Sequence, residues 1–336
     1  EIERLIQYLS QQLTECFRRR KRMIEYRNVR KYYGDQLIIQ DINMKVEDGE
    51  FVVIIGPSGC GKTTAIKMLN RLLETSDGNI LINGIDNKEM DLIQLRTMIG
   101  YVIQQIGLFP NMTVEENISV VPQILKWNKE KTKERVKELL SMVNMPYDSY
   151  AKKYPRQLSG GQQQRIGVLR AMAVNPPIII MDEPFGALDP ITREILQNEV
   201  KKIQKNLHIT VLFITHDMHE AMKLADRIVF MDQGKILQTA SPKEMVLHPA
   251  NETVAQFIRL QEVEAQKEQT SAKDLMQPLA GSVELARAVF VRETDSLETI
   301  GRNYDLSNNR KIYVQNQSGS VVGEITVESL ILNSIK

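Results

Sequence analysis

Cysteine is scarce in this sequence, and net charge is almost absent. The two cysteines, Cys16 and Cys60, lack the spacing of a metal site, and Cys60 lies in a glycine-rich loop that a disulfide would obstruct. Disulfides are therefore not expected, which suits a reducing cytosol. Lys and Arg total 43 against 42 Asp and Glu, and the net charge of +1 gives no field that would attract nucleic acid. We therefore expect no DNA or RNA partner.

Long hydrophobic runs are also missing. Apolar stretches such as residues 51–55 and 178–181 are far shorter than the roughly 20 residues that a helix needs to cross a bilayer. The chain does have length, with 336 residues, and a hydrophobic share of 42%. These values are sufficient for two domains, or for one large domain with an appendage. We expect a globular protein whose sequence contains no membrane span.

The first 22 residues combine an apolar pattern with a basic end. Apolar residues recur at helical spacing and are followed by a basic run at 18–22, just before Met23. These apolar residues are Ile2, Leu5, Ile6, Leu9, Leu13 and Phe17. Because Met23 resembles a natural translation start, we interpret residues 1–22 as an N-terminal extension or a fusion remnant. A helix that lies on an anionic membrane surface is the alternative.

A glycine-rich loop lies between a predicted buried strand and a predicted helix. Residues 56–63 fit the pattern G-x-x-x-x-G-K-[ST], and the helix is predicted from Thr63 through Leu72. In such a loop, backbone N–H groups and the helix N-terminus surround phosphates, Lys62 reaches the β- and γ-phosphates, and the Thr63 hydroxyl ligates Mg²⁺. The alternative is a plain glycine turn. The predicted nucleotide contacts are Gly56, Ser58, Gly59, Cys60, Gly61, Lys62, Thr63 and Thr64.

Two further stretches follow the glycine-rich loop. Residues 158–162 are Leu-Ser-Gly-Gly-Gln, and residues 178–184 are Ile-Ile-Ile-Met-Asp-Glu-Pro. With the glycine-rich loop, they resemble the signature and Walker B segments of the ABC-type ATPases. The resemblance covers about residues 23–260 and implies an α/β P-loop NTPase of ABC type. Such a fold has a RecA-like core, an antiparallel β subdomain and a helical subdomain, the last at about residues 105–160. Apolar spacing at 131–145 predicts one of its helices.

The resemblance assigns roles to the two acidic residues that end the apolar run 178–181. A buried parallel strand would deliver Asp182 and Glu183 to its carboxyl end, where α/β sheets bind ligands. Asp182 matches the residue that holds Mg²⁺, and Glu183 matches the carboxylate that polarises the attacking water. Mg²⁺, bound with ATP, is thus the implied cofactor, with Thr63, Gln104 and Asp182 as its ligands. The alternative role for Glu183 is to cap the following turn.

Four single residues complete the resemblance. Gln104 matches the Q-loop glutamine, His216 the switch histidine, and Asp189 the D-loop aspartate. Gln104 and His216 are thus expected to act with Glu183 in hydrolysis. Tyr33, which precedes a glycine, matches the aromatic residue that stacks on adenine, and a partly exposed sheet aromatic is the alternative. The switch histidine and the histidine three residues later would also form a metal pair, but the sequence offers no third ligand.

The signature stretch predicts a second phosphate site. Ser159 offers a hydroxyl, and Gly160 and Gly161 allow close approach. A helix that begins near Gln162 would direct its positive end at an anion. One chain cannot bring both phosphate sites to the same γ-phosphate if they lie on separate subdomains. The resemblance therefore implies a head-to-tail dimer, in which the glycine-rich loop of one copy and the signature of the second copy enclose each ATP.

Residues 105–114 resemble the region where importer ATPases hold the coupling helices of membrane subunits. Leu108, Phe109 and Met112 would line an apolar groove there, and a core turn is the alternative. Because the sequence has no membrane span, the resemblance implies a separate transmembrane permease, together with the importer's substrate-binding protein or domain. We then expect the chain at the cytoplasmic face of the cell membrane, held peripherally by the permease.

Residues 99–110 and the tetrapeptide Ser-Pro-Lys-Glu at 241–244 look most like ATPase subunits of quaternary-amine and osmoprotectant importers, those for glycine betaine, carnitine or choline. The ATP-hydrolysing subunit of such an importer is the expected function. The solute stays open, since the ATPase never touches it, and another methylated amine such as ergothioneine, or an amino acid, is the alternative. A soluble ABC ATPase of DNA repair or translation would carry a long coiled-coil insertion or two cassettes. A third class is a nucleotide-sensing regulator with a vestigial ATPase site.

The C-terminal part of the chain differs in composition from the ATPase-like segment. Residues 261–272 are mostly polar, which predicts a linker before a small α+β domain at 273–336. The predicted order of elements in this domain, β-α-β-β-α, resembles one CBS unit. The strands are predicted at 288–291, 311–315 and 321–325, with helix starts at Asp295 and Thr326.

The C-terminal unit departs from the CBS pattern in two ways. Such units commonly occur in pairs that bind adenine nucleotides, but only one unit is evident here. Glu328 stands where the family's ribose-binding aspartate is expected. Dimerisation of the unit with its twin is therefore the first expected role, and a nucleotide ligand, such as a cyclic dinucleotide, is the second.

Overall fold

The computed structural model describes residues 23–104, 107–186, 188–269, 272–277, 288–296, 299–300 and 311–326. The predicted N-terminal extension, residues 1–22, lies outside the described residues. Contacts divide the chain into two compact units, Glu1–Val254 and Ala255–Lys336. The boundary between the units falls inside a helix, α11 (Glu252–Gln269).

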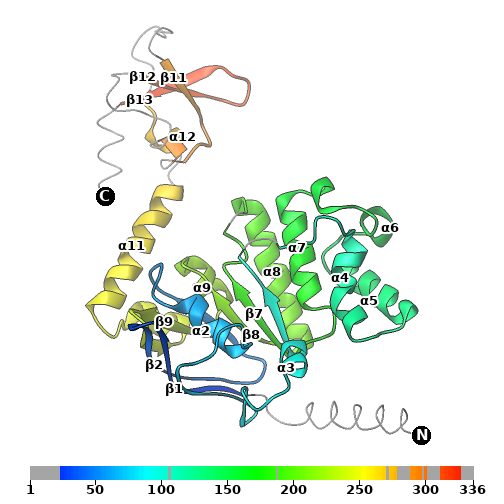
Figure 1. Cartoon of the computed structure of the whole chain (residues 1–336). Helices are drawn as coiled ribbons and strands as arrows, with labels where there is room; N and C mark the ends of the chain where they lie inside the picture. The colour runs from blue at the N-terminus through cyan, green and yellow to red at the C-terminus, as the bar shows by residue number, and fades with distance from the viewer. Residues whose placement is uncertain are drawn as a thin grey trace, which may run out of the picture. The chain divides into compact units, whose positions relative to one another are not determined.

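A six-stranded sheet with the order β10-β9-β3-β8-β7-β6 forms the centre of the first unit (Figure 1). Its strands are β3 (Phe51–Ile55), β6 (Ile99–Val102), β7 (Ile178–Asp182), β8 (Thr210–Ile214), β9 (Arg227–Asp232) and β10 (Lys235–Ala240). Strands β9 through β6 are parallel, and β10 pairs antiparallel with β9. Every residue of β3, β7 and β8 is buried, as expected when both faces are covered. The carboxyl ends of the parallel strands therefore meet at one edge, where α/β sheets bind ligands.

A second, antiparallel sheet packs against the same core. Its order is β2-β1-β4-β5, and its strands are β1 (Ile24–Tyr33), β2 (Gln36–Val46), β4 (Asp77–Ile82) and β5 (Ile85–Asp86). Apolar residues of β1, β2 and β4 share one cluster with residues of β3 and of the helix that follows it. The antiparallel strands expected between Met23 and the glycine-rich loop are thus present.

The helix after β3, α2 (Lys62–Leu69), begins one residue before Thr63 and is shorter than predicted. Asn70 forms its C-cap, and Arg71 adopts the left-handed backbone conformation with a φ of 52°. The chain therefore turns away before Leu72 can join the helix. The prediction of a helix through Leu72 was wrong at this end.

Helices α4 to α7 form a helical subdomain beside the six-stranded sheet (Figure 1). They are α4 (Val114–Ile124), α5 (Lys129–Met142), α6 (Tyr147–Tyr150) and α7 (Gly160–Ala171), with the 3₁₀ turn η1 (Pro155–Gln157) before α7. The predicted helical periodicity is confirmed in α5, where Val136, Leu139 and Leu140 are buried.

The remaining helices of the first unit are α3 (Leu92–Met98), α8 (Pro190–Leu207), α9 (Met218–Leu224) and α10 (Pro242–Leu247). Helix α8 leads from the end of β7 to the start of β8, and α9 follows β8. Both helices therefore begin at the carboxyl edge of the sheet. Among the described residues, no helix has the length and apolar character needed to cross a bilayer.

The second unit contains a three-stranded sheet with the order β11-β12-β13. The strands β11 (Ala288–Arg292), β12 (Lys311–Gln315) and β13 (Val321–Ile325) lie where the sequence predicts them, with β11 and β12 parallel and β13 antiparallel to β12. They share a small core with α12 (Ala272–Leu275). The polar segment predicted as a linker is helical up to Gln269, as part of α11. The predicted last helix and Glu328 lie outside the described residues, and the likeness to a CBS unit stays a prediction.

Candidate nucleotide-binding site

The glycine-rich loop joins the carboxyl end of β3 to α2 and needs glycine at two of its positions. Gly56 has a φ of 144°, and a Cβ added there would lie 1.9 Å from the carbonyl oxygen of Met231. Gly61 has a φ of 105°, and its Cβ would lie 2.5 Å from Cδ1 of Ile39 in β2. Ser58 and Gly59 are exposed at the tip of the loop. The loop is therefore pressed against β2 and against the end of β9, and its tip is open to solvent.

The ammonium group of Lys62 is held inside the loop. The residue is 5% exposed, and Nζ donates hydrogen bonds to the carbonyl oxygens of Gly56 at 2.7 Å and Pro57 at 2.8 Å. Sγ of Cys60 lies 3.9 Å from the same Nζ, and burial raises the pKa of this thiol. Cys60 is therefore a protonated packing residue of the loop, and Lys62 places a positive charge at its centre.

Thr63 and Asp182 meet at the start of α2. The Thr63 hydroxyl donates a 2.9 Å hydrogen bond to Oδ1 of Asp182, which lies at the carboxyl end of β7 and is 5% exposed. Burial raises the pKa of Asp182, and the hydrogen bond from Thr63 opposes this rise. Thr64, next along α2, is half-buried. A hydroxyl and a carboxylate in contact supply the hard oxygen ligands that Mg²⁺ prefers.

Thr63 and Asp182 are too few to form a complete metal site by themselves. Among the described residues, no group of three or more His, Cys, Asp or Glu side chains could hold a metal ion by itself, and this includes His216 with His219. Mg²⁺ commonly binds one or two protein groups together with phosphate oxygens. The residues present therefore fit a cation that arrives with a nucleotide better than a permanent protein-only metal site.

The carboxylate of Glu183 lies between two residues that are distant in the sequence. Nε2 of Gln104, which follows β6, donates a 3.0 Å hydrogen bond to Oε2 of Glu183. Nδ1 of His216, which follows β8, lies 3.4 Å from Oε1. Three of the predicted site residues thus converge where β6, β7 and β8 end. The side chain is engaged with Gln104 and His216, which leaves capping of the turn to the backbone carbonyl of Glu183, the acceptor for Gly186 N.

The backbone at Glu183 is held in an uncommon conformation. Its φ is 44°, in the left-handed region, and its N–H donates to the carbonyl oxygen of Ile214 at 3.0 Å. A residue other than glycine in this region costs on the order of 1–3 kcal/mol and persists where the surroundings fix it. The bond to β8 therefore fixes the backbone from which the side chain projects, and Gln104 and His216 hold the carboxylate itself.

Tyr33 ends β1 near the glycine-rich loop. Its side chain is 48% exposed, and Nζ of Lys31 lies 5.3 Å from the ring centroid. Ile39 of the paired strand β2 is the residue that packs against Gly61. The strand pair that contacts the loop therefore ends in an exposed aromatic ring.

The signature residues lie on the helical subdomain, apart from the residues around Glu183. Ser159 caps α7: its Oγ accepts from Gln162 N at 3.3 Å, while Gln162 Oε1 accepts from Ser159 N at 3.1 Å. The helix begins at Gly160, and not near Gln162 as predicted, because the cap draws both glycines into its first turn. A Cβ at Gly160 would meet open space, whereas one at Gly161 would lie 2.4 Å from Cγ2 of Thr192.

Asp189 starts the helix that borders the signature. Its Oδ1 accepts from Thr192 N at 3.0 Å and so caps α8. A hydrogen bond from the Thr192 side chain, together with this backbone bond, lowers the pKa of Asp189. Since Thr192 also contacts Gly161, the D-loop aspartate and the signature are neighbours within one chain.

The predicted docking segment is held by a residue that sequence analysis missed. Asn117 in α4 is fully buried, and its amide donates to the carbonyl oxygens of Phe109 at 3.1 Å and Met112 at 3.0 Å and accepts from Phe109 N at 2.8 Å. Phe109 is 45% exposed and Met112 37% exposed, while Leu108 is half-buried. A polar residue on the buried face of an apolar helix was the only sign of this role in the sequence.

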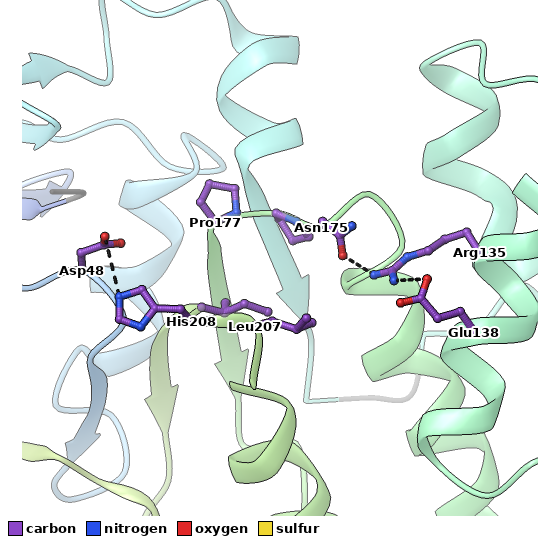
Figure 2. Close-up of a pocket in the computed structure, with 9 residues that line it drawn as sticks. Asp48, Arg135, Glu138, Asn175, Pro177, Leu207 and His208 are labelled. Carbon is purple, nitrogen blue, oxygen red and sulfur yellow. Dashed lines mark hydrogen bonds and ion pairs between the residues drawn. The ribbon is translucent and has the colours of Figure 1, made fainter. Parts of the chain in front are cut away.

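A cavity of about 340 Å³ lies at the opposite, amino-terminal edge of the sheet. Figure 2 shows Arg135, which pairs with Glu138 and Asn175, and His208, which faces Asp48. Arg135 also donates to the carbonyl oxygen of Ala173 at 3.1 Å, beyond the C-terminal end of α7. The charges here are paired with one another, so this hollow lacks the converging, available groups of the carboxyl edge.

Comparison with known proteins begins with a family match. Residues 39–186 match the model of the ABC transporter family. The carnitine transport ATP-binding protein OpuCA of Listeria monocytogenes is 46% identical over 319 residues, which cover 93% of this chain and 77% of that protein. The chain belongs to the ABC transporter family. The predicted fold class, a P-loop ATPase cassette with mixed α/β sheets, is confirmed with it.

Other relatives and solved structures of this ABC family extend the comparison. The choline transport ATP-binding protein OpuBA of Bacillus subtilis is 56% identical over 237 residues, or 70% of this chain and 62% of that protein. The chain thus spans less than two thirds of the length of some relatives it matches. A dimeric bacterial ABC transporter cassette superposes with a TM-score of 0.59 at 35% identity, covering 65% of this chain and 98% of that structure.

Proposed function

We propose that the chain hydrolyses ATP and so energises a membrane importer of quaternary amines. The observation that carries the hydrolysis is the placement of Glu183 between Gln104 and His216, next to the contact of Thr63 with Asp182. A carboxylate with a fixed direction beside a site for charged phosphates is what activation of a water molecule requires.

Each residue at the carboxyl edge has a physical role in this proposal. The glycine-rich loop and the N-terminus of α2 receive the phosphates, and Lys62 exchanges its carbonyl partners for phosphate oxygens. Thr63, Asp182 and Gln104 offer oxygen ligands to Mg²⁺, which would offset phosphate charge when it binds with ATP. Glu183 orients and polarises the attacking water, and His216 fixes the position of this carboxylate relative to the γ-phosphate. Tyr33 stacks on the adenine ring.

A second copy of the chain completes each site in this proposal. The signature residues Ser159, Gly160, Gly161 and Gln162 form a helix N-terminus with an open glycine on a different subdomain from the loop, and Asp189 adjoins them. Solved cassettes of the same fold are described as dimers, one of them bound to ADP and Pi at 34% identity and a TM-score of 0.58. ATP would then bridge two copies, and its hydrolysis would release them.

The partners in membrane transport follow from an exposed apolar segment. Phe109 and Met112 present apolar surface on a loop that Asn117 fixes, which suits the docking of a short helix from a transmembrane permease. The chain would be peripheral at the cytoplasmic face of the membrane. A substrate-binding protein or domain would deliver the solute. In the second unit, the CBS-like module would pair with its twin, or take a nucleotide.

The solute class rests on names borne by relatives. These include transport ATP-binding proteins for carnitine, for choline and for glycine betaine, carnitine and choline together. Relatives named for spermidine/putrescine and for sulfate/thiosulfate import are less similar, at 41% and 43% identity. A quaternary amine is therefore the proposed cargo, with another methylated amine or an amino acid as the alternative.

The test is transport by the assembled complex. The full chain is purified with its permease from the native membrane, placed in vesicles with the substrate-binding component, and assayed for ATP hydrolysis. Glycine betaine, carnitine and choline should each be tried, with spermidine and sulfate as controls. We expect stimulation by at least one quaternary amine. Stimulation by spermidine or sulfate alone would contradict the proposed cargo, and recovery of the chain only with ribosomes or nucleic acid would contradict transport itself.

A further inference from the structure

Arg193 in α8 reaches two loops at the carboxyl edge of the sheet. It lies one helical turn after Asp189, the N-cap of α8. Nη2 of Arg193 donates to the carbonyl oxygen of Leu188 at 3.3 Å, and Nη1 lies 3.6 Å from Oδ2 of Asp217. One guanidinium group thus joins the loop of Asp189 to the residue that follows His216.

The residues on both sides of His216, Thr215 and Asp217, are each held by contacts with helices. Asp217 caps α9 with Oδ1, which accepts from His219 N at 2.7 Å, so that Oδ2 is the oxygen turned to Arg193. On the other side of His216, the Thr215 hydroxyl donates to Oε2 of Glu220 at 2.6 Å and accepts from Asp217 N at 3.0 Å. His216 is therefore held between two anchored neighbours.

A buried carboxylate closes this network against α8. Glu220 is 6% exposed, and its Oε1 accepts from Nε2 of Gln197 at 3.1 Å. A buried carboxyl group needs such hydrogen-bond partners, because burying it without them would cost folding free energy. Gln197 lies one turn after Arg193 on α8, so both ends of the His216 loop are positioned by adjacent turns of one rigid helix.

Arg193 has one donor group that is not paired among the described residues. Its Nε is buried and has no hydrogen-bond partner within the part of the chain that the structure describes. Its contact with Asp217, at 3.6 Å, is longer than a normal hydrogen bond. A small displacement of the Asp189 loop, which moves Leu188, would therefore change the pairing with Asp217 directly.

We propose that Arg193 is a positioning residue that couples the Asp189 loop to His216, so that contact of this loop with a second copy of the chain is transmitted to the pair of His216 with Glu183. The inference rests on the site assignment and the dimer proposed above. It adds a route by which dimer closure reaches the hydrolytic site within one subunit, through α8. The requirement is geometric, because Leu188 and Asp217 must share one planar group with several donors.

The test compares the steady-state ATPase kinetics of the full chain with those of three variants. Arg193→Met should lower kcat by about ten- to a hundredfold, the cost of misplacing a reacting group, with equilibrium ATP binding unchanged. Arg193→Lys keeps the positive charge but lacks the planar fork that spans Leu188 and Asp217, so it should recover only part of this loss. Asp217→Asn keeps the cap of α9 but removes the ion pair, and it should lower kcat similarly. The double variant should be no worse than either single variant.

Arg227→Met is the matched control. Arg227 is as exposed as Arg193, at 28%, and pairs with Glu50 at 2.7 Å at the other edge of the sheet. Its loss should lower thermal stability but leave kcat per folded molecule unchanged. The coupling is contradicted if Arg193→Met keeps the parental kcat, if it weakens ATP binding instead, or if the Arg193 and Asp217 effects multiply. Parental turnover in Glu183→Gln would contradict the site assignment itself, whatever the Arg193 variants do.

Discussion

The two edges of the six-stranded sheet differ in how their polar side chains are arranged. At the amino-terminal edge a cavity of about 340 Å³ is lined by Arg135, Glu138, Asp48 and His208, whose charges face one another (Figure 2). At the carboxyl edge, hydrogen-bonding groups from the ends of β6, β7 and β8 converge around Glu183. With the active site proposed at the carboxyl edge, convergence of polar groups at parallel strand ends is a better guide to function than empty volume.

The largest expected effect is the loss of ATP turnover when Glu183 at the carboxyl edge is replaced. Glu183→Gln should lower kcat for ATP by about a hundredfold or more, because the amide cannot polarise water. Nucleotide binding should persist, and sedimentation with ATP should show an accumulated dimer. Lys62→Ala is the contrasting variant, since it should weaken binding of the nucleotide itself in an equilibrium titration. If Glu183→Gln turned over ATP at the parental rate, the functional contrast between the edges would be lost.

The amino edge should respond in stability and not in turnover. Arg135→Met removes donors from the carbonyl oxygens of Met172 and Ala173, and it should lower the free energy of unfolding by about 1–3 kcal/mol. Denaturant titration measures this loss, and ATPase assays of the folded variant should give the parental kcat. A large fall in kcat at parental stability would mean that both edges serve the reaction.

Asp182 offers a pH test of the carboxyl edge. Burial raises its pKa in the folded state, so that its ionised form costs stability at neutral pH, and this cost fades as the pH falls through the raised pKa. In nucleotide-free protein, Asp182→Asn should therefore raise Tm by about 2–4 °C near pH 7 and by less in acid. Asp189, whose pKa a hydrogen bond from Thr192 lowers, predicts the opposite sign for Asp189→Asn. Equal shifts for both variants at all pH values would disprove this assignment.

The smallest effect is expected at the rim of the amino-edge cavity. Nε2 of His208 lies 3.9 Å from Asp48 Oδ2, and the His208 side chain is 72% exposed. Solvent screens such a pair, so Asp48→Asn should change the free energy of unfolding by less than about 0.5 kcal/mol and leave kcat unaltered. A change in the free energy of unfolding of several times this size would show that the pair at the cavity rim contributes substantially to stability.

Much of the fold was predictable because local patterns and tertiary contacts agree. The buried strands beside the glycine-rich loop and before Asp182 have continuous apolar runs, and α5 shows a clear helical period. Helix ends were harder to predict. The cap at Ser159 placed two glycines inside α7, and Arg71 in the left-handed region ended α2 early. Neither the cap nor the left-handed residue is marked by a periodic pattern in the sequence.

The candidate site was predictable as a set of residues, but not as a set of contacts. The resemblance to ABC-type ATPases singled out Gln104, Glu183 and His216, and only the strand order brings them together. Arg193 and Asn117 were missed because each is a common polar residue in an amphipathic helix. Their roles arise from carbonyl oxygens on other segments, which no local pattern records.

The ammonium group of Lys62 is hydrogen-bonded within its own loop, to the carbonyl oxygens of Gly56 and Pro57. Entry of a phosphate is then an exchange of partners, so the free energy of nucleotide binding is reduced by the cost of breaking these two bonds. We expect the reverse exchange to accompany departure of ADP, when the lysine returns to the two carbonyl oxygens. The two carbonyl oxygens are in this sense intramolecular competitors of the product's phosphates, which favours turnover over tight retention.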